Sequence, residues 1–368
     1  MASLLRVRLV INDLRRAGAE SQHVLLARGL AAAGHDVALI LLKEGNDFEA
    51  ELAASGLPLV HLRQTGRSDL GLPLRLRRVL LADPSDVVHA SLFFANLVTT
   101  VALAGKRAPA LVLSQRCSYR DGLNPLLRAV AHACHRRAHA LIVNSRASAR
   151  EATAAVPRER VVYVPNGVAK PPGTQEAPSA RPPGQLVACV GQLTPEKGHR
   201  FLIEAWPEVA RRHPDARMVL AGEGPMREVL LARIRALGIQ ESVVLSGFDP
   251  HPGKLLEAAD VYVQPSLSEG MPNAVMEAMS LGLPVVATAV GAVPDLIEHG
   301  SSGCLVSPAD AGALTSALDA LLDDVPKRRR LGAAAARRMR SDFSVATMVD
   351  ATLAVYRRAL ERAAVPRN

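Results

Sequence analysis

Short apolar runs, each followed by a stretch with helical periodicity, recur along the chain and constrain its fold more than any other feature. In the first half they read LRVRLVIN, DVALILL, LPLVHL, DVVHAS, ALVLSQ, ALIVNS and VVYVPNG. They are rich in Val, Leu and Ile without polar alternation, which is typical of parallel strands covered by helices on both faces. The helical stretch AESQHVLLARGLAAAG ends on Gly34, a common helix stop. We therefore expect an α/β fold with doubly wound parallel sheets.

A proline-rich segment divides this pattern in two. Residues 169–185, AKPPGTQEAPSARPPGQ, contain five prolines and little that a core could bury, which indicates a linker. The alternation then restarts with LVACVGQL, ARMVLAGEG, VVLSGF, DVYVQPS, PVVATAV and GCLV. The pattern predicts two Rossmann-like domains, at residues 1–168 and 186–343, followed by a C-terminal helix and tail at residues 344–368. The last two helices are expected at about residues 327–340 and 344–363.

Composition and sequence pattern argue against several classes of protein. No apolar run reaches the roughly 18 residues that a membrane-spanning helix needs, and the start MASLLRVRLVIN lacks a small-residue cleavage site. We therefore expect a cytoplasmic protein. The cysteines have no CxxC or Cys/His spacing typical of zinc sites, so no metal site is predicted and they are expected to be reduced and structural: Cys117, Cys134, Cys189 and Cys304.

The excess of positive charge is confined to one half of the chain. Residues 1–168 hold 22 Lys and Arg against 13 Asp and Glu, an excess of 9, which equals the net charge of +9 for the whole chain. Segments 72–81 and 126–140 place arginines among leucines, as in helices that lie on anionic headgroups, although solvated outer faces explain the pattern equally well. An anionic membrane surface on the inner face of the cytoplasmic membrane is thus a candidate partner. Nucleic acid is not expected, because aromatic residues make up 3% and no basic recognition motif occurs.

The stretch PSLSEGMPNAVMEAMSLGLP, residues 265–284, sets two glutamates on either side of a predicted helix start. Pro272 suits the first helical position, because its fixed φ fits a helix and its missing N–H is not needed there. The backbone amides that follow are donors at the positive end of a helix and predict an anion site: Asn273, Ala274 and Val275.

Glu269 lies on the loop before this helix, and Glu277 lies about one and a half turns inside it. A carboxylate accepts two hydrogen bonds and suits a vicinal diol, whereas two carboxylates crowded onto one phosphate would repel it. The pattern therefore favours a ligand with hydroxyl groups at both ends and phosphate in the middle, such as a nucleotide sugar. First-turn acids favoured by the helix dipole are the alternative explanation.

The stretch GQLTPEKGHRFLIEAW adds a cation to the same domain. Gly191 ends a predicted strand, Gly198 opens a helix, and Lys197 lies on the loop between them. Both stretches follow strands of one parallel sheet, so Lys197 is expected at the sheet edge that holds the anion site. There it can balance the charge of a diphosphate.

These motifs resemble glycosyltransferase family 4, whose members have the GT-B fold of two Rossmann-like domains. The resemblance covers nearly the whole chain and is strongest in the last two thirds. It rests on AGAESQ, VPNGV, VGQLTPEKG, AGEGP and SGF, and above all on EGMPNAVMEAM at residues 269–279, the E-x7-E element of the family. The C-terminal helix is then expected to return to the first domain.

The resemblance implies a role for individual residues. Glu277 would bind the ribose hydroxyls and Glu269 the donor sugar, and Lys197 and Glu269 are the residues expected to carry catalysis. The donor would also contact a set of glycines, amides and backbone groups: Gly18, Gly191, Gln192, Gly222, Phe248, Gly270, Met271, Asn273 and Ala274.

Two positions depart from the family pattern. Gln192 stands where relatives often have an arginine, which leaves Lys197 more of the diphosphate charge to balance. Arg116, in LSQRCS, stands where many relatives have a histidine. Arg116 and His89, at the end of the run DVVHAS, are the candidates on the acceptor side, with a hydrogen-bonded structural histidine as the alternative for His89.

The resemblance implies a retaining transferase that moves a sugar from a UDP-sugar or GDP-sugar to a glycan or lipid-linked acceptor, as in cell-surface polysaccharide or lipopolysaccharide biosynthesis. The departing phosphate would take the acceptor proton in a front-face displacement. No cofactor is expected, and without a D-x-D element no divalent metal is expected either. A nucleotide-sugar epimerase of the same fold and a non-catalytic nucleotide-sugar-binding protein are the alternatives.

Overall fold

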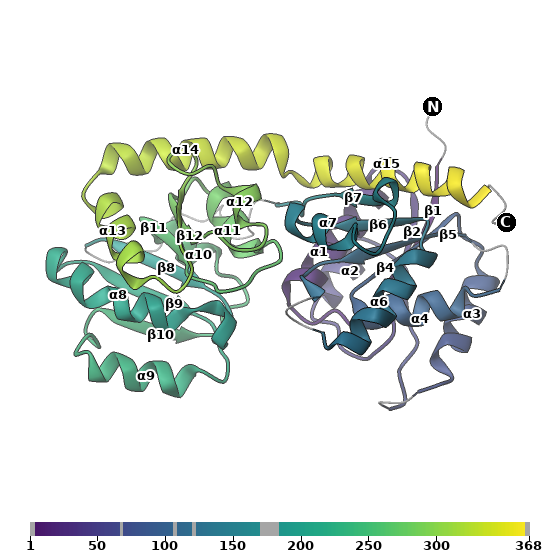
Figure 1. Ribbon diagram of the computed structural model, residues 1–368, viewed down its shortest axis with the longest axis horizontal. Coiled ribbons are helices and arrows are strands. Elements are labelled where there is room, and N and C mark those ends of the chain that lie inside the picture. Colours follow the sequence, from purple (N-terminus) through teal and green to yellow (C-terminus); the bar gives the residue numbers. More distant parts are fainter. Residues whose placement is uncertain (1–3, 67–68, 106–108, 120–122, 170–183, 365–368) are drawn as a thin grey trace. The chain divides into compact units, whose positions relative to one another are not determined.

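The computed structural model describes residues 4–66, 69–105, 109–119, 123–169 and 184–364 (Figure 1). It forms two compact units. Unit 1 comprises Met1–Gly167 and Val345–Asn368, and unit 2 comprises Val168–Ser344. Most of the predicted linker, residues 170–183, lies outside the described residues.

Unit 1 is built on a parallel sheet with the strand order β3-β2-β1-β4-β5-β6-β7. The order reverses between β1 and β4, which makes this pair the topological switch point. Each strand falls within one of the seven apolar runs of the first half: β1 (Arg6–Ile11), β2 (Asp36–Leu41), β3 (Leu59–His61), β4 (Val87–Ser91), β5 (Ala110–Gln115), β6 (Ala140–Val143) and β7 (Val161–Tyr163).

Helices cover both faces of this sheet. The helices are α1 (Gly18–Ala32), α2 (Glu49–Ala54), α3 (Leu72–Ala82), α4 (Phe93–Ala102), α6 (Pro125–Arg137), α7 (Arg146–Ala152) and α15 (Val345–Ala364). Because strand side chains alternate between faces, Val7, Leu9 and Ile11 of β1 join one core with α1 and α15. Val10 joins the other core, with residues of α3, α4 and α6. In Figure 1 these three helices lie below the strands of this sheet and α15 lies above them. The sheet is therefore buried on both sides, as its uniformly apolar strands predict.

The last helix belongs to unit 1, although it is separated in sequence from the rest of that unit by all of unit 2. Its Tyr356 is fully buried and, with Met348 and Val349, packs into the core beside α1. This confirms the expected return of the C-terminal helix. The two terminal helices, α14 (Val325–Asp342) and α15, begin and end within about two residues of the expected positions.

Unit 2 repeats the architecture with the strand order β10-β9-β8-β11-β12-β13, again all parallel and with the order reversing between β8 and β11. Its strands are β8 (Leu186–Val190), β9 (Arg217–Ala221), β10 (Val243–Gly247), β11 (Val261–Gln264), β12 (Val285–Thr288) and β13 (Cys304–Val306). Its remaining helices are α8 (His199–Arg212), α9 (Arg227–Ala236), α10 (Gly253–Ala258), α11 (Asn273–Ser280), α12 (Val293–Leu296) and α13 (Ala311–Leu322). The predicted α/β class with two doubly wound sheets is confirmed.

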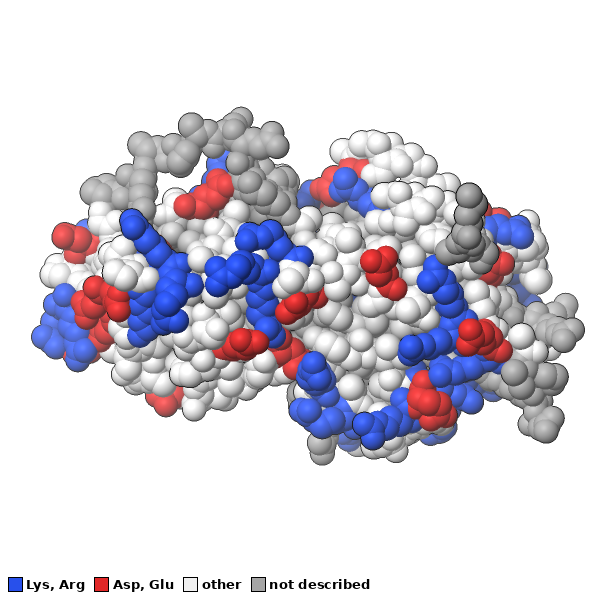
Figure 2. Space-filling model, turned by 90° about the horizontal axis from the view of Figure 1, so that it is seen from above, with Lys and Arg blue, Asp and Glu red and all other residues white. Residues whose placement is uncertain are grey.

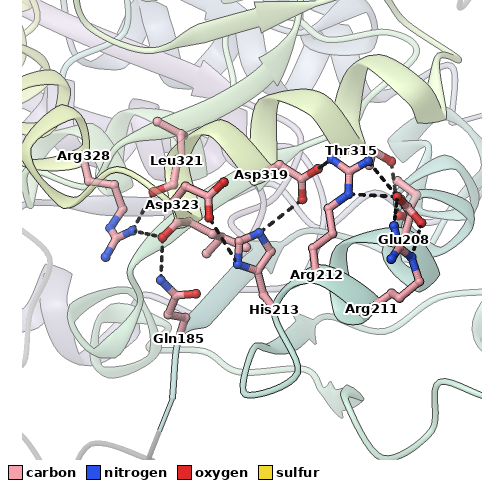
Figure 3. A network of polar contacts seen from close by, with 12 residues as sticks. Gln185, Glu208, Arg211, Arg212, His213, Thr315, Asp319, Leu321, Asp323 and Arg328 are labelled. Carbon is pink, nitrogen blue, oxygen red and sulfur yellow. Dashed lines mark hydrogen bonds and ion pairs between the residues drawn. The ribbon is translucent and has the colours of Figure 1, made fainter.

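A polar network fastens the end of α8 to α13 (Figure 3). Arg212 donates to the Asp319 carboxylate at 2.5 Å, and the His213 ring lies 3.3 Å from the other oxygen of Asp319. Gln185, which directly precedes β8, donates to the carbonyl of Leu322 at 2.7 Å. The network therefore lies at the amino-terminal edge of the sheet. The opposite edge, where ligands bind in open α/β sheets, is free of it.

The surface charge is mixed on the face that Figure 2 shows. Lys and Arg side chains form several separate groups there, with Asp and Glu between them. None of the described helices combines the length and the hydrophobicity that crossing a bilayer requires.

Candidate functional site

The loops after β8 and β11 meet at the switch point of unit 2. After β8 the chain passes through a 3-10 turn, Pro195–Lys197, and Gly198 then starts α8 from a left-handed conformation with φ of 66°. A Cβ atom at Gly198 would lie 2.0 Å from the carbonyl oxygen of Pro265, the first residue after β11. Only a glycine lets the two loops approach so closely. This contact places Lys197 beside the loop that carries Glu269.

Lys197 and Glu269 form an ion pair. The Lys197 ammonium lies 2.8 and 2.9 Å from the two carboxylate oxygens of Glu269. The Glu269 side chain is 6% exposed, while 24% of the Lys197 side chain stays exposed. Because Glu269 is buried, the attraction between the two charges is screened less by water than in a surface pair. The ammonium keeps one N–H donor for a ligand, since Lys has three N–H groups and the Glu269 oxygens accept two of them.

Side chains beneath Glu269 fix its carboxylate. The Ser266 hydroxyl donates to Glu269 Oε1 at 2.7 Å, and the Gln264 amide nitrogen lies 3.3 Å from the same oxygen. Tyr262, fully buried in β11, donates to Gln264 Oε1 at 2.6 Å. Thr288, at the end of β12, donates to the Ser266 carbonyl at 2.5 Å. Glu269 thus rests on a hydrogen-bonded chain that begins in the core and holds Lys197 in place.

The sequence pattern alone does not single out these supporting residues. The run DVYVQPS, which contains Tyr262, Gln264 and Ser266, has the apolar character of an ordinary buried strand. Polar groups at alternate positions near the carboxyl end of a central strand were the available signal, because that is where an α/β sheet presents its ligand-binding side chains.

The helix between the two glutamates begins one residue later than predicted. Pro272 is the N-cap, with φ of −74° and ψ of 115°, and α11 runs from Asn273. The correction has a physical reason, because the residue before a helix keeps extended ψ while it still accepts the first helical hydrogen bond. Pro272 provides no side-chain cap to the first turn. The positive end of α11 therefore keeps its character as an anion site.

Glu277 lies half-buried on α11, on the other side of this helix start from Glu269. Burial raises the pKa of Glu277 to about 7. Near neutral pH this carboxyl group is therefore divided between a proton donor and a carboxylate acceptor.

The other donor-side candidates surround the same strand ends. Gly191 and Gly222 follow β8 and β9, and a Cβ at Gly222 would lie 1.9 Å from the Gly191 carbonyl oxygen. Gly270 accepts a hydrogen bond from the Ala292 amide at 2.8 Å. The remaining candidates differ in exposure: Gln192 is exposed, Phe248 is 62% exposed, Met271 is buried, and Asn273 and Ala274 are half-buried.

The other three candidates lie in unit 1. Gly18 is an exposed residue at the start of α1. His89 is fully buried, and its ring nitrogens lie 2.7 Å from the Tyr356 hydroxyl and 2.6 Å from the Ser114 hydroxyl. That arrangement matches the structural alternative for His89. Arg116 is 9% exposed and donates to Asn166 Oδ1 at 3.1 Å.

Within the described parts of the chain, no three His, Cys, Asp or Glu side chains are grouped so as to hold a metal ion.

Two family models match adjoining parts of this chain. The model of Glycosyltransferase Family 4 matches residues 16–169, and the model of Glycosyl transferases group 1 matches residues 174–338. The boundary between them falls in the proline-rich segment. The chain belongs to glycosyltransferase family 4.

Curated relatives agree with this assignment. The chain is 30% identical over 254 residues to alpha-D-kanosaminyltransferase of Streptomyces kanamyceticus, a match that covers 68% of this chain and 61% of the relative. It is 37% identical over 137 residues to the putative colanic acid biosynthesis glycosyltransferase WcaL of Salmonella typhimurium, which covers 35% and 34%. The chain thus matches less than two thirds of the length of these relatives.

Solved structures show the fold. The Anabaena protein HepE, solved in complex with UDP and glucose, superposes with a TM-score of 0.83 and 22% identity over 95% of this chain and 98% of its own. Sucrose-phosphate synthase from Thermosynechococcus elongatus has a TM-score of 0.79 and 20% identity over 96% and 98%. The family 4 chain therefore has the GT-B fold.

Proposed function

We propose that this chain is a retaining glycosyltransferase that binds a nucleoside diphosphate sugar on unit 2, with UDP-sugars as the first choice and GDP-sugars as the second. One observation carries the proposal: the Lys197–Glu269 pair lies at the switch point of the sheet, in the loops beside α11 and Glu277. Family membership supports it, and so does the likeness to HepE, which was solved with UDP and glucose.

Each group has a distinct task in this proposal. Lys197 and the first amides of α11 stabilise the charge that grows on the diphosphate as the sugar leaves, without a divalent metal. Glu277 accepts the ribose hydroxyls, and Glu269 holds the Lys197 ammonium and contributes to binding of the donor sugar. The acceptor is a glycan or a lipid-linked glycan, in keeping with the name of the colanic acid relative.

A panel of UDP-sugars and GDP-sugars tests the function. We expect one of them to raise the melting temperature of the chain and to be hydrolysed slowly without an acceptor, with release of the α-sugar from an α-linked donor. Conversion of the donor to another nucleotide sugar would instead establish the epimerase. Binding without hydrolysis or transfer would establish the non-catalytic alternative.

Glu277 predicts a pH dependence of donor binding. Below pH 7 its carboxyl group is protonated, and above pH 7 it becomes the carboxylate that accepts both ribose hydroxyls. A single ionisation centred near 7 gives about a tenfold rise in affinity between pH 6 and pH 8. Calorimetric titration with UDP-glucose measures it, because the diphosphate diester stays ionised throughout this range. Glu277→Gln should remove the rise, whereas a flat profile in the wild type would refute the ribose role.

The exposed faces of α3 and α6 in unit 1 are suited to contact with an anionic membrane. Leu74, Arg78 and Leu81 of α3 follow an i, i+4, i+7 spacing and are exposed on its outer face, and Leu126 of α6 is 73% exposed. The other two α3 arginines are engaged within the protein. Arg75 pairs with Asp69, and Arg77 donates to the α4 end. Of the three α3 arginines, Arg78 therefore remains for contact with headgroups on this face. Most of the membrane contact is expected from the exposed leucines.

We expect the chain to co-sediment with anionic liposomes at low salt. Replacing Leu74 and Leu81 together by Ser should weaken this binding about tenfold, since each leucine contributes apolar area to insertion. Val229→Ser, on an exposed position of α9 in unit 2, is the matched control and should not change it. Equal liposome binding by the double variant and the wild type would show that the outer face of α3 does not contact the membrane.

A further inference from the structure

The carboxyl-terminal edge of the unit 1 sheet carries a row of unsatisfied polar groups. Four buried side-chain atoms there have no hydrogen-bond partner in the described part of the chain: Asn12 Oδ1, Ser91 Oγ, Arg116 Nε and Asn144 Oδ1. They end or follow β1, β4, β5 and β6, which are consecutive in the sheet and span its switch point. Neighbouring strands lie about 4.8 Å apart, so the row spans the width of a small ligand. Buried polar groups normally have hydrogen-bond partners, so a row of unpaired atoms indicates a site for a ligand that supplies them.

Arg116 is the charged member of this row. Its side chain is 9% exposed, and its hydrogen bond to a described side chain goes to Asn166, a neutral amide. No carboxylate from the described residues pairs with it. Burial lowers its pKa to about 10, so the guanidinium remains charged at neutral pH. A buried charge without a counterion costs several kcal/mol, which indicates that the fold keeps Arg116 for a partner from outside.

His23 provides an independent second observation. It lies on α1, is fully buried, and neither of its ring nitrogens has a hydrogen-bond partner in the described chain. Its ring lies 6.1 Å from that of His89, and the nearby Arg116 charge helps burial to keep it neutral. His89, in contrast, has both nitrogens satisfied. Arg116 Nε and both ring nitrogens of His23 therefore lack hydrogen-bond partners among the described residues, in two buried side chains that are close enough for the Arg116 charge to lower the His23 pKa.

We propose that Arg116 binds an anionic group, a carboxylate or a phosphate, on a hydroxylated acceptor substrate. The planar guanidinium matches either anion through paired N–H groups. The oxygens of Asn12, Ser91 and Asn144 accept hydrogen bonds from sugar hydroxyls on the same molecule. The positive charge of Arg116 repels the ammonium group of an amino sugar and therefore disfavours its binding. The assignment of this ligand as the acceptor rests on the proposed transferase function, whereas the preference for an anion does not.

Titration of the full chain with small sugars tests the preference. Glucose 6-phosphate and glucuronate carry the two candidate anions, glucose is the neutral reference, and glucosamine is the cationic one. We expect at least one anionic sugar to bind about tenfold or more tightly than glucose, and glucosamine to bind most weakly. Whichever of the two binds identifies the anion. Equal binding of glucose and both anionic sugars overturns the proposal without the need for a variant.

Three variants assign the effect to the residue. Arg116→Gln should abolish the preference, and Arg116→Lys should retain most of it because the charge remains. Arg150→Gln, at an exposed position of α7, is the matched control and should behave as the wild type. An anion preference that persists in a folded Arg116→Gln overturns the proposal.

Titration of the same variants with UDP-glucose separates the two functional claims. Arg116→Gln should bind UDP-glucose as the wild type does. Loss of nucleotide-sugar binding with intact binding of anionic sugars would assign Arg116 to the donor and overturn the proposal. A wild type that binds no nucleotide sugar contradicts the proposed function, while the sugar titration still decides the anion preference.

Discussion

Lys197→Ala should reduce turnover about 10²-fold to 10³-fold, the usual loss when a preorganised donor to a developing anion is removed. Its ammonium is held by both oxygens of Glu269 and therefore needs no reorganisation when the diphosphate charge grows. Steady-state hydrolysis and transfer with the best donor of the panel measure the loss. Lys327→Ala, on α14 of the same unit, is the matched control and should remain active. Near-normal turnover of a folded Lys197→Ala would eliminate the assignment.

A second variant separates catalysis from stability. Lys197→Ala leaves the Glu269 carboxylate, 6% exposed, without its cation, and an uncompensated buried charge destabilises the fold. The double variant Lys197→Ala/Glu269→Gln removes that charge as well. It should recover much of the lost stability in urea unfolding, yet its turnover should stay low. Recovery of both together would show that Lys197 acts on the fold alone.

Gly198→Ala should destabilise unit 2 by roughly 3 kcal/mol and weaken donor binding. The new Cβ would need a left-handed φ and would lie 2.0 Å from the Pro265 carbonyl oxygen, a backbone atom that cannot rotate away. Gly238 offers a matched control, because its φ is +67° with no atom within 4 Å of an added Cβ. Gly238→Ala should cost only about 1 kcal/mol. Equal losses for the two variants in urea unfolding would show that the loop contact is unimportant.

The sequence predicts local features of the site better than its long-range contacts. The apolar runs and the helix start between Glu269 and Glu277 are local patterns, and the structure forms the strands and the helix close to their expected places. The position of Pro272 was wrong by one residue because a proline fits both the N-cap and the first helical turn.

Contacts between residues that are distant in the chain could not be predicted from local sequence patterns. Lys197 and Glu269 are 72 residues apart, and their pairing depends on how closely Gly198 lets two loops approach. His89 appeared as a strand-end candidate, yet Tyr356, 267 residues away on the returning helix, closes over it. Likewise the partners of Arg75 and Arg77 lie outside their own helix. The sequence pattern alone therefore could not show that these two arginines are engaged within the protein while Arg78 is exposed.

The most direct measurement is calorimetric titration of UDP-glucose and GDP-mannose into the full chain and into Lys197→Ala and Glu277→Gln. The account predicts that one of the two donors binds the wild type with a one-to-one ratio, and that each variant binds it at least about tenfold more weakly. Unchanged affinity in both variants, or binding of neither donor by the wild type across pH 6 to 8, would contradict a nucleotide-sugar site built on Lys197, Glu269 and Glu277.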